Sequence, residues 1–120
     1  MDGKDTLREA DNDSRKLELL DRLELEHELF YYRMVSRPSK EVYNECGCIR
    51  FHESIYEYFL YCDGISSRHI RACMEERSIF DALYRVYLND EELEVYTWDG
   101  IRHLLDVFIQ THEVKQEGAA

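Results

Sequence analysis

The scarcity of helix-breaking residues is the feature that most constrains the fold of this chain. Its 120 residues include one proline and five glycines. So few breakers in so long a chain favour helices over many short strands. Apolar residues that recur at alternating spacings of three and four point the same way. The sequence therefore predicts an all-α fold, a single small domain of five to six short helices.

The first third of the chain predicts a lead and a long helix. Residues 1–13 are polar and are expected to be disordered. Asp13 or Ser14 caps a first helix that runs to about Val35. The inward stripe of this helix holds Leu20, Leu23, His27, Phe30 and Met34. Carboxylates lie mostly on its other sides, so we expect an acidic exposed surface.

A second helix is predicted to start at Pro38, because a proline is well tolerated in the first helical turn. Gly47 interrupts the apolar pattern that follows. We expect either a kink at this glycine or two helices, the later one carrying residues 51–60. Asp63 and Gly64 then form a turn.

Capping residues predict three further helices. Ser66 caps a short helix that runs to about residue 76. Ser78, with Asp81 three residues later, resembles the capping box that starts a helix. Thr97 caps a last helix with a strong apolar stripe. Residues 93–96 are a short helix or a loop, because a lone strand would have no partner.

These boundaries predict a helical domain over residues 14–112 and a frayed tail over residues 113–120. No run of about 18 apolar residues is present, so no membrane span is expected. The first residues lack the pattern of a secretion signal, which predicts a cytoplasmic protein. Its four cysteines are then expected to be reduced thiols.

Acidity is the second informative feature of the chain. It has 26 Asp and Glu against 15 Lys and Arg, for a formal net charge of −11. Such a surface repels nucleic-acid phosphates and attracts basic grooves on other proteins. We therefore expect a protein partner and no direct binding of nucleic acid. The residues 89–99 contain no Lys or Arg and hold five carboxylates: Asp90, Glu91, Glu92, Glu94 and Asp99.

Three of the cysteines are candidate zinc ligands. Cys48 and His52 are four residues apart, which is a workable spacing on a helix, and Cys46 and Cys62 are nearby in the sequence. Structural zinc sites have a second ligand pair, which this chain lacks. The pattern favours small apolar thiols in a helical core, with no metal and no cofactor.

No spacing of histidine, serine, cysteine or carboxylate residues matches a nucleophile motif, and the glycines are too dispersed for a phosphate loop. The sequence therefore predicts that the protein is not an enzyme. One helix is rich in aromatic residues: Tyr56, Tyr58, Phe59 and Tyr61. They are half core and half boundary, or they form a contact surface beside carboxylates.

The chain resembles small acidic helical domains of unknown function from Firmicutes and their mobile elements. The likeness covers about residues 24–110 and rests on the stretch from residues 27–31 through Tyr43, then on residues 53–56 and 78–84. In size, charge and tyrosine content the chain is also similar to phage-encoded anti-CRISPR proteins that block Cas9. The resemblance to these proteins implies an inhibitor that binds a type II CRISPR effector.

Our leading hypothesis is an acidic inhibitor that binds Cas9 and blocks PAM and DNA binding by DNA mimicry. A helix rises about 1.5 Å per residue, so its carboxylates reach a density near that of duplex DNA, about one charge per 1.7 Å. The five carboxylates of residues 90–99 would occupy arginines that grip the PAM duplex. Aromatic contacts would come from Tyr87, Tyr96 and Trp98. The alternative is a helical interaction or regulatory module, antitoxin-like or a co-regulator, that self-associates through the tyrosine-rich helix.

Overall fold

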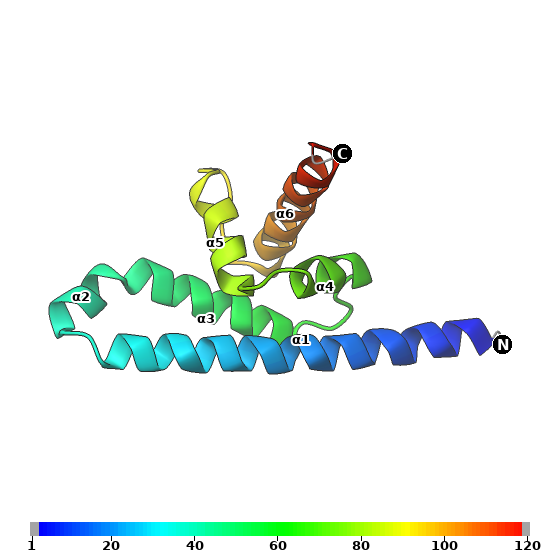
Figure 1. The fold of residues 1–120 in the computed structure, drawn as a ribbon, viewed down its shortest axis with the longest axis horizontal. Helices are drawn as coiled ribbons and strands as arrows, with labels where there is room; N and C mark the ends of the chain where they lie inside the picture. The colour runs from blue at the N-terminus through cyan, green and yellow to red at the C-terminus, as the bar shows by residue number, and fades with distance from the viewer. Residues whose placement is uncertain (1–2, 119–120) are drawn as a thin grey trace.

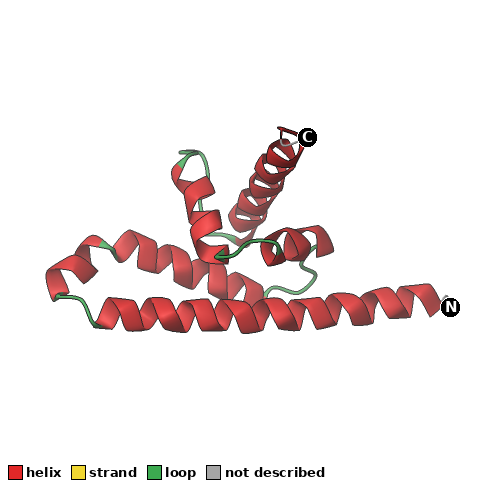
Figure 2. Ribbon diagram, viewed as in Figure 1, coloured by secondary structure: helices red, strands yellow, loops and turns green. Residues whose placement is uncertain are grey.

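A computed structural model describes residues 3–118, and it describes side chains for residues 14–42 and 45–111. Within these residues every regular element is a helix, as Figure 2 shows, so the predicted all-α class is confirmed. The helices are α1 (Gly3–Val35), α2 (Ser39–Asn44), α3 (Cys46–Tyr61), α4 (Ser67–Met74), α5 (Ile79–Leu88) and α6 (Trp98–Gly118).

Helix α1 runs along one edge of the molecule, and the other helices lie on one side of it (Figure 1). Helix α2 turns the chain back, so that α3 packs beside α1 in the opposite direction. Helices α4 and α5 also contact α1, and α6 packs on α4 and α5. The long first helix gives the molecule an elongated shape of 57 × 31 × 27 Å.

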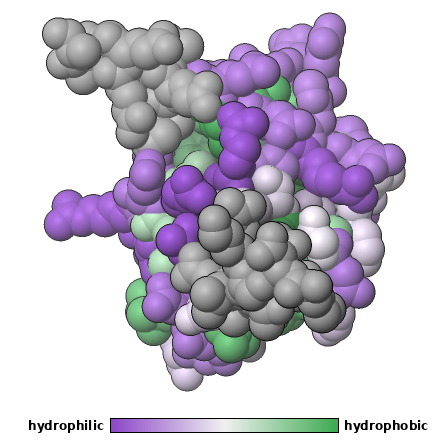
Figure 3. Space-filling model, turned by 90° about the vertical axis from the view of Figure 1, so that its right-hand side faces the viewer, coloured by the Kyte–Doolittle hydropathy of each residue, from purple (hydrophilic) through white to green (hydrophobic). Residues whose placement is uncertain are grey.

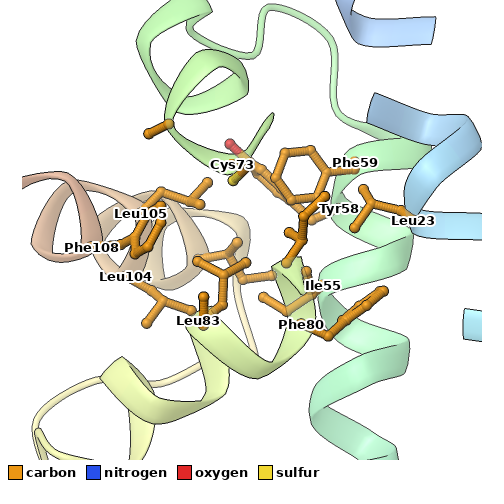
Figure 4. Packing of buried hydrophobic residues seen from close by; sticks show 14 of the residues in the cluster. Leu23, Ile55, Tyr58, Phe59, Cys73, Phe80, Leu83, Leu104, Leu105 and Phe108 are labelled. Carbon is orange, nitrogen blue, oxygen red and sulfur yellow. The ribbon is translucent and has the colours of Figure 1, made fainter. Parts of the chain in front are cut away.

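The core lies where α1, α3, α4, α5 and α6 meet. Leu23 of α1 points toward Ile55 and Phe59 of α3, and Leu83 of α5 lies beside Leu104 of α6 (Figure 4). Each such side chain contributes about 1.5–3 kcal/mol when fully buried. The inward stripe predicted for the first helix is confirmed in part. Leu23, Phe30 and Met34 are buried, but Leu20 and His27 are only half-buried, and the fully buried Leu19 was not predicted.

Two predicted helix boundaries are wrong. Helix α1 begins at Gly3, so Asp13 and Ser14 lie inside the helix and do not cap it. Residues 4–13 contain no proline that would end the helix. Helix α6 runs to Gly118, beyond the predicted end near residue 112. The predicted split into a lead (1–13), a domain (14–112) and a tail (113–120) stays a prediction, since the side chains of both ends lie outside the described ones.

The region after Pro38 forms two helices, one of the two predicted outcomes, but the break falls at Glu45. The Glu45 backbone leaves the helical region, with φ −96° and ψ 9°. Gly47 instead lies in the first turn of α3. Among the described residues, no atom beyond its two chain neighbours and the backbone of its own helix lies within 4 Å of the position that a Cβ would take there, so this position does not require a glycine. The predicted turn at Gly64 is confirmed by its φ of +74°.

Two of the predicted caps are confirmed by hydrogen bonds. The Arg68 N–H donates to Ser66 Oγ at 3.2 Å at the start of α4. The Gly100 N–H donates to Thr97 Oγ1 at 3.0 Å at the start of α6. Helix α4 ends at Met74, two residues before the predicted end. Residues 93–96 form a loop, as one of the two expected outcomes.

The capping box predicted at Ser78 is wrong, because the cap of α5 comes from α1. Glu26 Oε2 accepts a hydrogen bond from the Ile79 N–H and Oε1 accepts one from the Phe80 N–H, both at 3.1 Å. One turn earlier on α1, the Arg22 guanidinium donates to the Met74 carbonyl at 2.8 Å. A cation thus sits at the end of α4 and an anion at the start of α5, which matches both helix dipoles.

A buried histidine fills the space between α1, α3 and α5. The His52 ring lies between Phe30 and Phe80, with centroid distances of 3.8 and 4.3 Å and nearly parallel planes. Burial lowers the pKa of His52 to about 4. The neutral ring therefore acts as an aromatic core residue at neutral pH.

Candidate interaction surfaces

The acidic segment predicted as the partner-binding site forms the loop between α5 and α6. Leu93 and Val95 are buried in the core and fix this loop to the domain. The carboxylates around them are not equivalent. Glu91 and Glu92 are exposed, whereas Asp90 and Glu94 are partly buried.

Glu94 builds the loop rather than projecting from it. Its carboxylate accepts hydrogen bonds from the backbone N–H groups of Tyr96 and Thr97 and from the Thr97 hydroxyl, which lies 2.7 Å away. The hydroxyl bond, together with the backbone bonds, lowers the pKa of Glu94. A Cβ atom at Gly100 would collide with the Glu94 backbone oxygen as well as with Oε1, so this turn requires a glycine. These contacts use most of the acceptor capacity of Glu94 within the chain.

Two more of the five predicted carboxylates have partners within the chain. Asp90 Oδ1 accepts a hydrogen bond from the Glu92 N–H at 3.0 Å and so closes a local turn. Asp99 Oδ1 lies 3.3 Å from Arg102 Nη1, one turn along α6. Exposed pairs of this kind contribute at most about 1 kcal/mol. The loop therefore presents a weaker negative surface than its composition indicates.

The three predicted aromatic contacts do not form one cluster. Tyr87 packs against Phe51, with ring centroids 5.1 Å apart. Tyr96 is 74% exposed and lies under the Arg50 guanidinium at 5.9 Å, beside Tyr87 on a shallow cavity of about 280 Å³. Trp98 does not line this cavity and instead contacts Tyr58 edge-on. The structure thus brings Tyr87 and Tyr96 together but not Trp98.

A larger groove, which sequence reasoning missed, lies between α1, α2 and α3. It has a volume of about 450 Å³, within the range of ligand and peptide pockets. Its walls are mostly apolar and aromatic, and Arg37, Ser39 and Glu53 lie at its polar positions. The apolar and aromatic lining consists of Phe30, Tyr31, Met34, Val35, Val42 and Ile49, with His27 beside them.

One carboxylate lines this groove, and three others lie nearby on α1 and α3. Glu53 lines it, and Glu57 follows one turn later on α3. Tyr56 stacks on His27 at 4.8 Å, and its pKa is raised by burial and by the charges of Glu24 and Glu28 on α1. Within the described part of the chain, none of the four exposed carboxylates takes part in an ion pair or a side-chain hydrogen bond. We call Glu24, Glu28, Glu53 and Glu57 the groove carboxylates.

The sequence shows that these carboxylates lie on helix faces, but it does not show that the two faces lie next to each other. Each pair of groove carboxylates is spaced by four residues, so each pair lies on one helix face. Sequence periodicity does not say which helices pack together, and the two pairs meet only because α2 folds α3 back along α1.

The candidate zinc ligands are dispersed. Cys62 is buried, but Cys46 is exposed and Cys48 is half-buried, so the expectation that all three thiols pack in the core is only partly met. His52 is held between two phenylalanine rings. Among the described residues, no three or more His, Cys, Asp or Glu side chains are arranged to hold a metal ion.

The tyrosine-rich part of α3 divides between core and surface. Tyr58 and Phe59 are almost fully buried, whereas Tyr61 is 69% exposed. Burial raises the pKa of Tyr58 to about 12, which keeps this phenol neutral. The four aromatic residues therefore do not present one continuous contact surface.

The face of the molecule shown in Figure 3 is mainly hydrophilic, with small apolar patches. None of the described helices combines the length and the apolar character that a membrane crossing requires. Comparison with protein-family models, with curated proteins and with solved structures gives no match.

Proposed function

We propose that this protein is an acidic inhibitor that binds a basic nucleic-acid groove on another protein and excludes DNA or RNA from it. A type II CRISPR effector of the Cas9 kind is the partner to test first. The observation that carries the proposal is the apolar and aromatic groove between α1, α2 and α3, with the exposed Glu53 in its lining. Three further exposed carboxylates lie nearby on the same two helices: Glu24 and Glu28 act on Tyr56, and Glu57 lies one turn from Glu53.

The charge spacing on α1 supports this proposal. Glu18, Asp21, Glu24 and Glu28 are exposed and span ten residues, or about 15 Å of helix axis. That is roughly one charge per 5 Å, about one and a half times the 3.4 Å spacing of phosphates along one DNA strand. Arginines that normally bind phosphates or guanine edges would find a comparable row of negative charge here.

The apolar lining of the groove can contribute binding affinity, which a charged surface alone supplies only weakly. Exposed charge pairs contribute little affinity but raise the association rate. Affinity comes from a few well-packed anchors, usually aromatic or arginine side chains. Tyr31 lines the groove, and Tyr56 stacks on His27, another lining residue, so the stem of an arginine or an apolar side chain of the partner can pack there.

The test compares two variants that each lose four carboxylates. The groove variant carries E24Q, E28Q, E53Q and E57Q. The loop variant carries D90N, E91Q, E92Q and D99N, and it leaves the structural Glu94 in place. Both variants lose four negative charges. A difference in binding between them therefore comes from the position of the lost charges and not from the net charge. Binding to the Cas9–guide RNA complex and inhibition of DNA cleavage are measured, and circular dichroism verifies that both variants fold.

The expected result is that the wild-type protein and the loop variant bind and inhibit, whereas the groove variant loses about 10-fold or more in affinity, mostly through slower association. Loss of binding in the loop variant alone would assign the binding site to the acidic loop predicted from the sequence. It would refute the proposal that the groove binds the partner. Absence of binding by the wild-type protein would refute Cas9 as the partner.

A further inference from the structure

Helix α1 carries an apolar stripe on the side that faces away from the domain. Leu25, Leu29 and Tyr32 are 58%, 55% and 67% exposed. They are spaced by four and then three residues, so they lie along one helix face. Figure 1 shows the other helices on one side of α1 only. None of the three residues lines the groove between α1 and α3.

Two exposed charged residues beside this stripe have opposite signs, whereas the half-buried Glu26 beside it is hydrogen-bonded to the start of α5. In heptad terms, Leu29 holds position a, and Leu25 and Tyr32 hold position d. Glu28 then holds position g and Arg33 position e, and both are exposed. In a parallel helix pair, each g side chain meets the e side chain five residues later in the partner helix. A second copy in parallel orientation would therefore form two Glu28–Arg33 pairs by symmetry.

We propose that this face of α1 binds a second copy of the chain, as a parallel pair of α1 helices around a two-fold axis. An antiparallel pair would bring the Glu28 sides of both helices together, which is repulsive. The stripe covers only about two turns, so the contact belongs to the small interfaces that bury less than about 1,200 Å². The expected dimer is weak and forms at micromolar concentrations or above. Its formation does not depend on the inhibitor function proposed above.

Sedimentation equilibrium from about 1 to 200 μM tests the stripe. The wild-type protein is expected to dimerise. L25S/L29S removes four leucines from the dimer and is expected to raise the dissociation constant by about 100-fold or more. The matched control is L17S/L88S, which replaces two leucines that are 63% and 61% exposed and lie off the stripe. All four sites are exposed, so the fold is expected to persist, and circular dichroism checks this.

Charge exchange tests the orientation. E28R and R33E are each expected to weaken the homodimer, because each puts like charges opposite one another. An equimolar mixture of the two variants is expected to form a heterodimer about as stable as the wild-type dimer, since both flanking contacts then join an arginine to a glutamate again. A wild-type protein that stays monomeric up to about 200 μM, or an L25S/L29S variant that dimerises like its control, overturns the proposal. A mixture no tighter than either variant alone overturns the parallel arrangement.

Discussion

The cap that Glu26 supplies to α5 makes a quantitative prediction about stability. Its side chain is 18% exposed, and both carboxylate oxygens accept backbone N–H groups, of Ile79 and Phe80, at 3.1 Å. Removal of a helix N-cap costs about 0.5–2 kcal/mol. Loss of a negative charge at a helix N-terminus costs about 0.3–1 kcal/mol more. We therefore expect Glu26→Ala to lower the free energy of unfolding by about 2 kcal/mol.

Urea denaturation followed by circular dichroism measures this change. In a domain of this size, about 2 kcal/mol corresponds to a fall in Tm of about 8 °C. Glu26→Gln retains one acceptor oxygen without the charge, so it is expected to fall between Glu26→Ala and the wild-type protein. The control is Glu18→Ala, an exposed carboxylate on the same helix, with an expected change within about 0.5 kcal/mol. If Glu26→Ala destabilises the protein no more than Glu18→Ala does, the long-range cap contributes nothing and the reasoning is wrong.

Three other predictions follow from buried or hydrogen-bonded groups. The folded pKa of His52, about 4, lies below the unfolded value of about 6.5, so protonation favours the unfolded chain and stability is lost as the pH falls from 6.5 toward 4. Between pH 7 and 5 His52 accounts for a loss of about 2 kcal/mol, and urea titrations of His52→Phe should show a correspondingly flatter pH profile. Gly100→Ala is expected to lower the free energy of unfolding by about 1–3 kcal/mol in the same assay, because the new methyl group collides with Glu94 side-chain and backbone atoms; an unchanged midpoint would contradict this. Thr97→Val is expected to raise the pKa of Glu94 toward its ordinary value in an NMR titration, and an unmoved pKa would show that the hydroxyl bond is unimportant.

Local signals predicted the local features of the fold. Ser66 and Thr97 cap the backbone two and three residues later, so the chain segment itself contains both partners. The cap of α5 could not be predicted this way, because Glu26 lies 53 residues from the N–H group it accepts. A capping box at Ser78 was the best local interpretation, and tertiary packing replaced it.

The candidate site shows the same division between local and tertiary information. Counting carboxylates found the loop of residues 89–97, but it could not show that Glu94 would be used by the loop itself. The groove carboxylates were visible only as acidic helix faces. The two pairs lie near each other only because α1 packs against α3. Neither the spacing of the carboxylates nor the composition of the chain predicts this packing.

The role of the groove carboxylates is tested most directly by the association rate with the Cas9–guide RNA complex, measured at 0.1 M and 1 M salt. The Debye length shortens from about 10 Å to about 3 Å between these conditions. If the groove carboxylates are attracted to the nucleic-acid site of the partner, the association rate of the wild-type protein falls steeply between 0.1 M and 1 M salt. The association rate of the groove variant is then already low at 0.1 M salt and changes little at 1 M. The loop variant should keep most of the wild-type salt dependence. A wild-type rate that is the same at both salt concentrations would contradict the charge-driven mechanism.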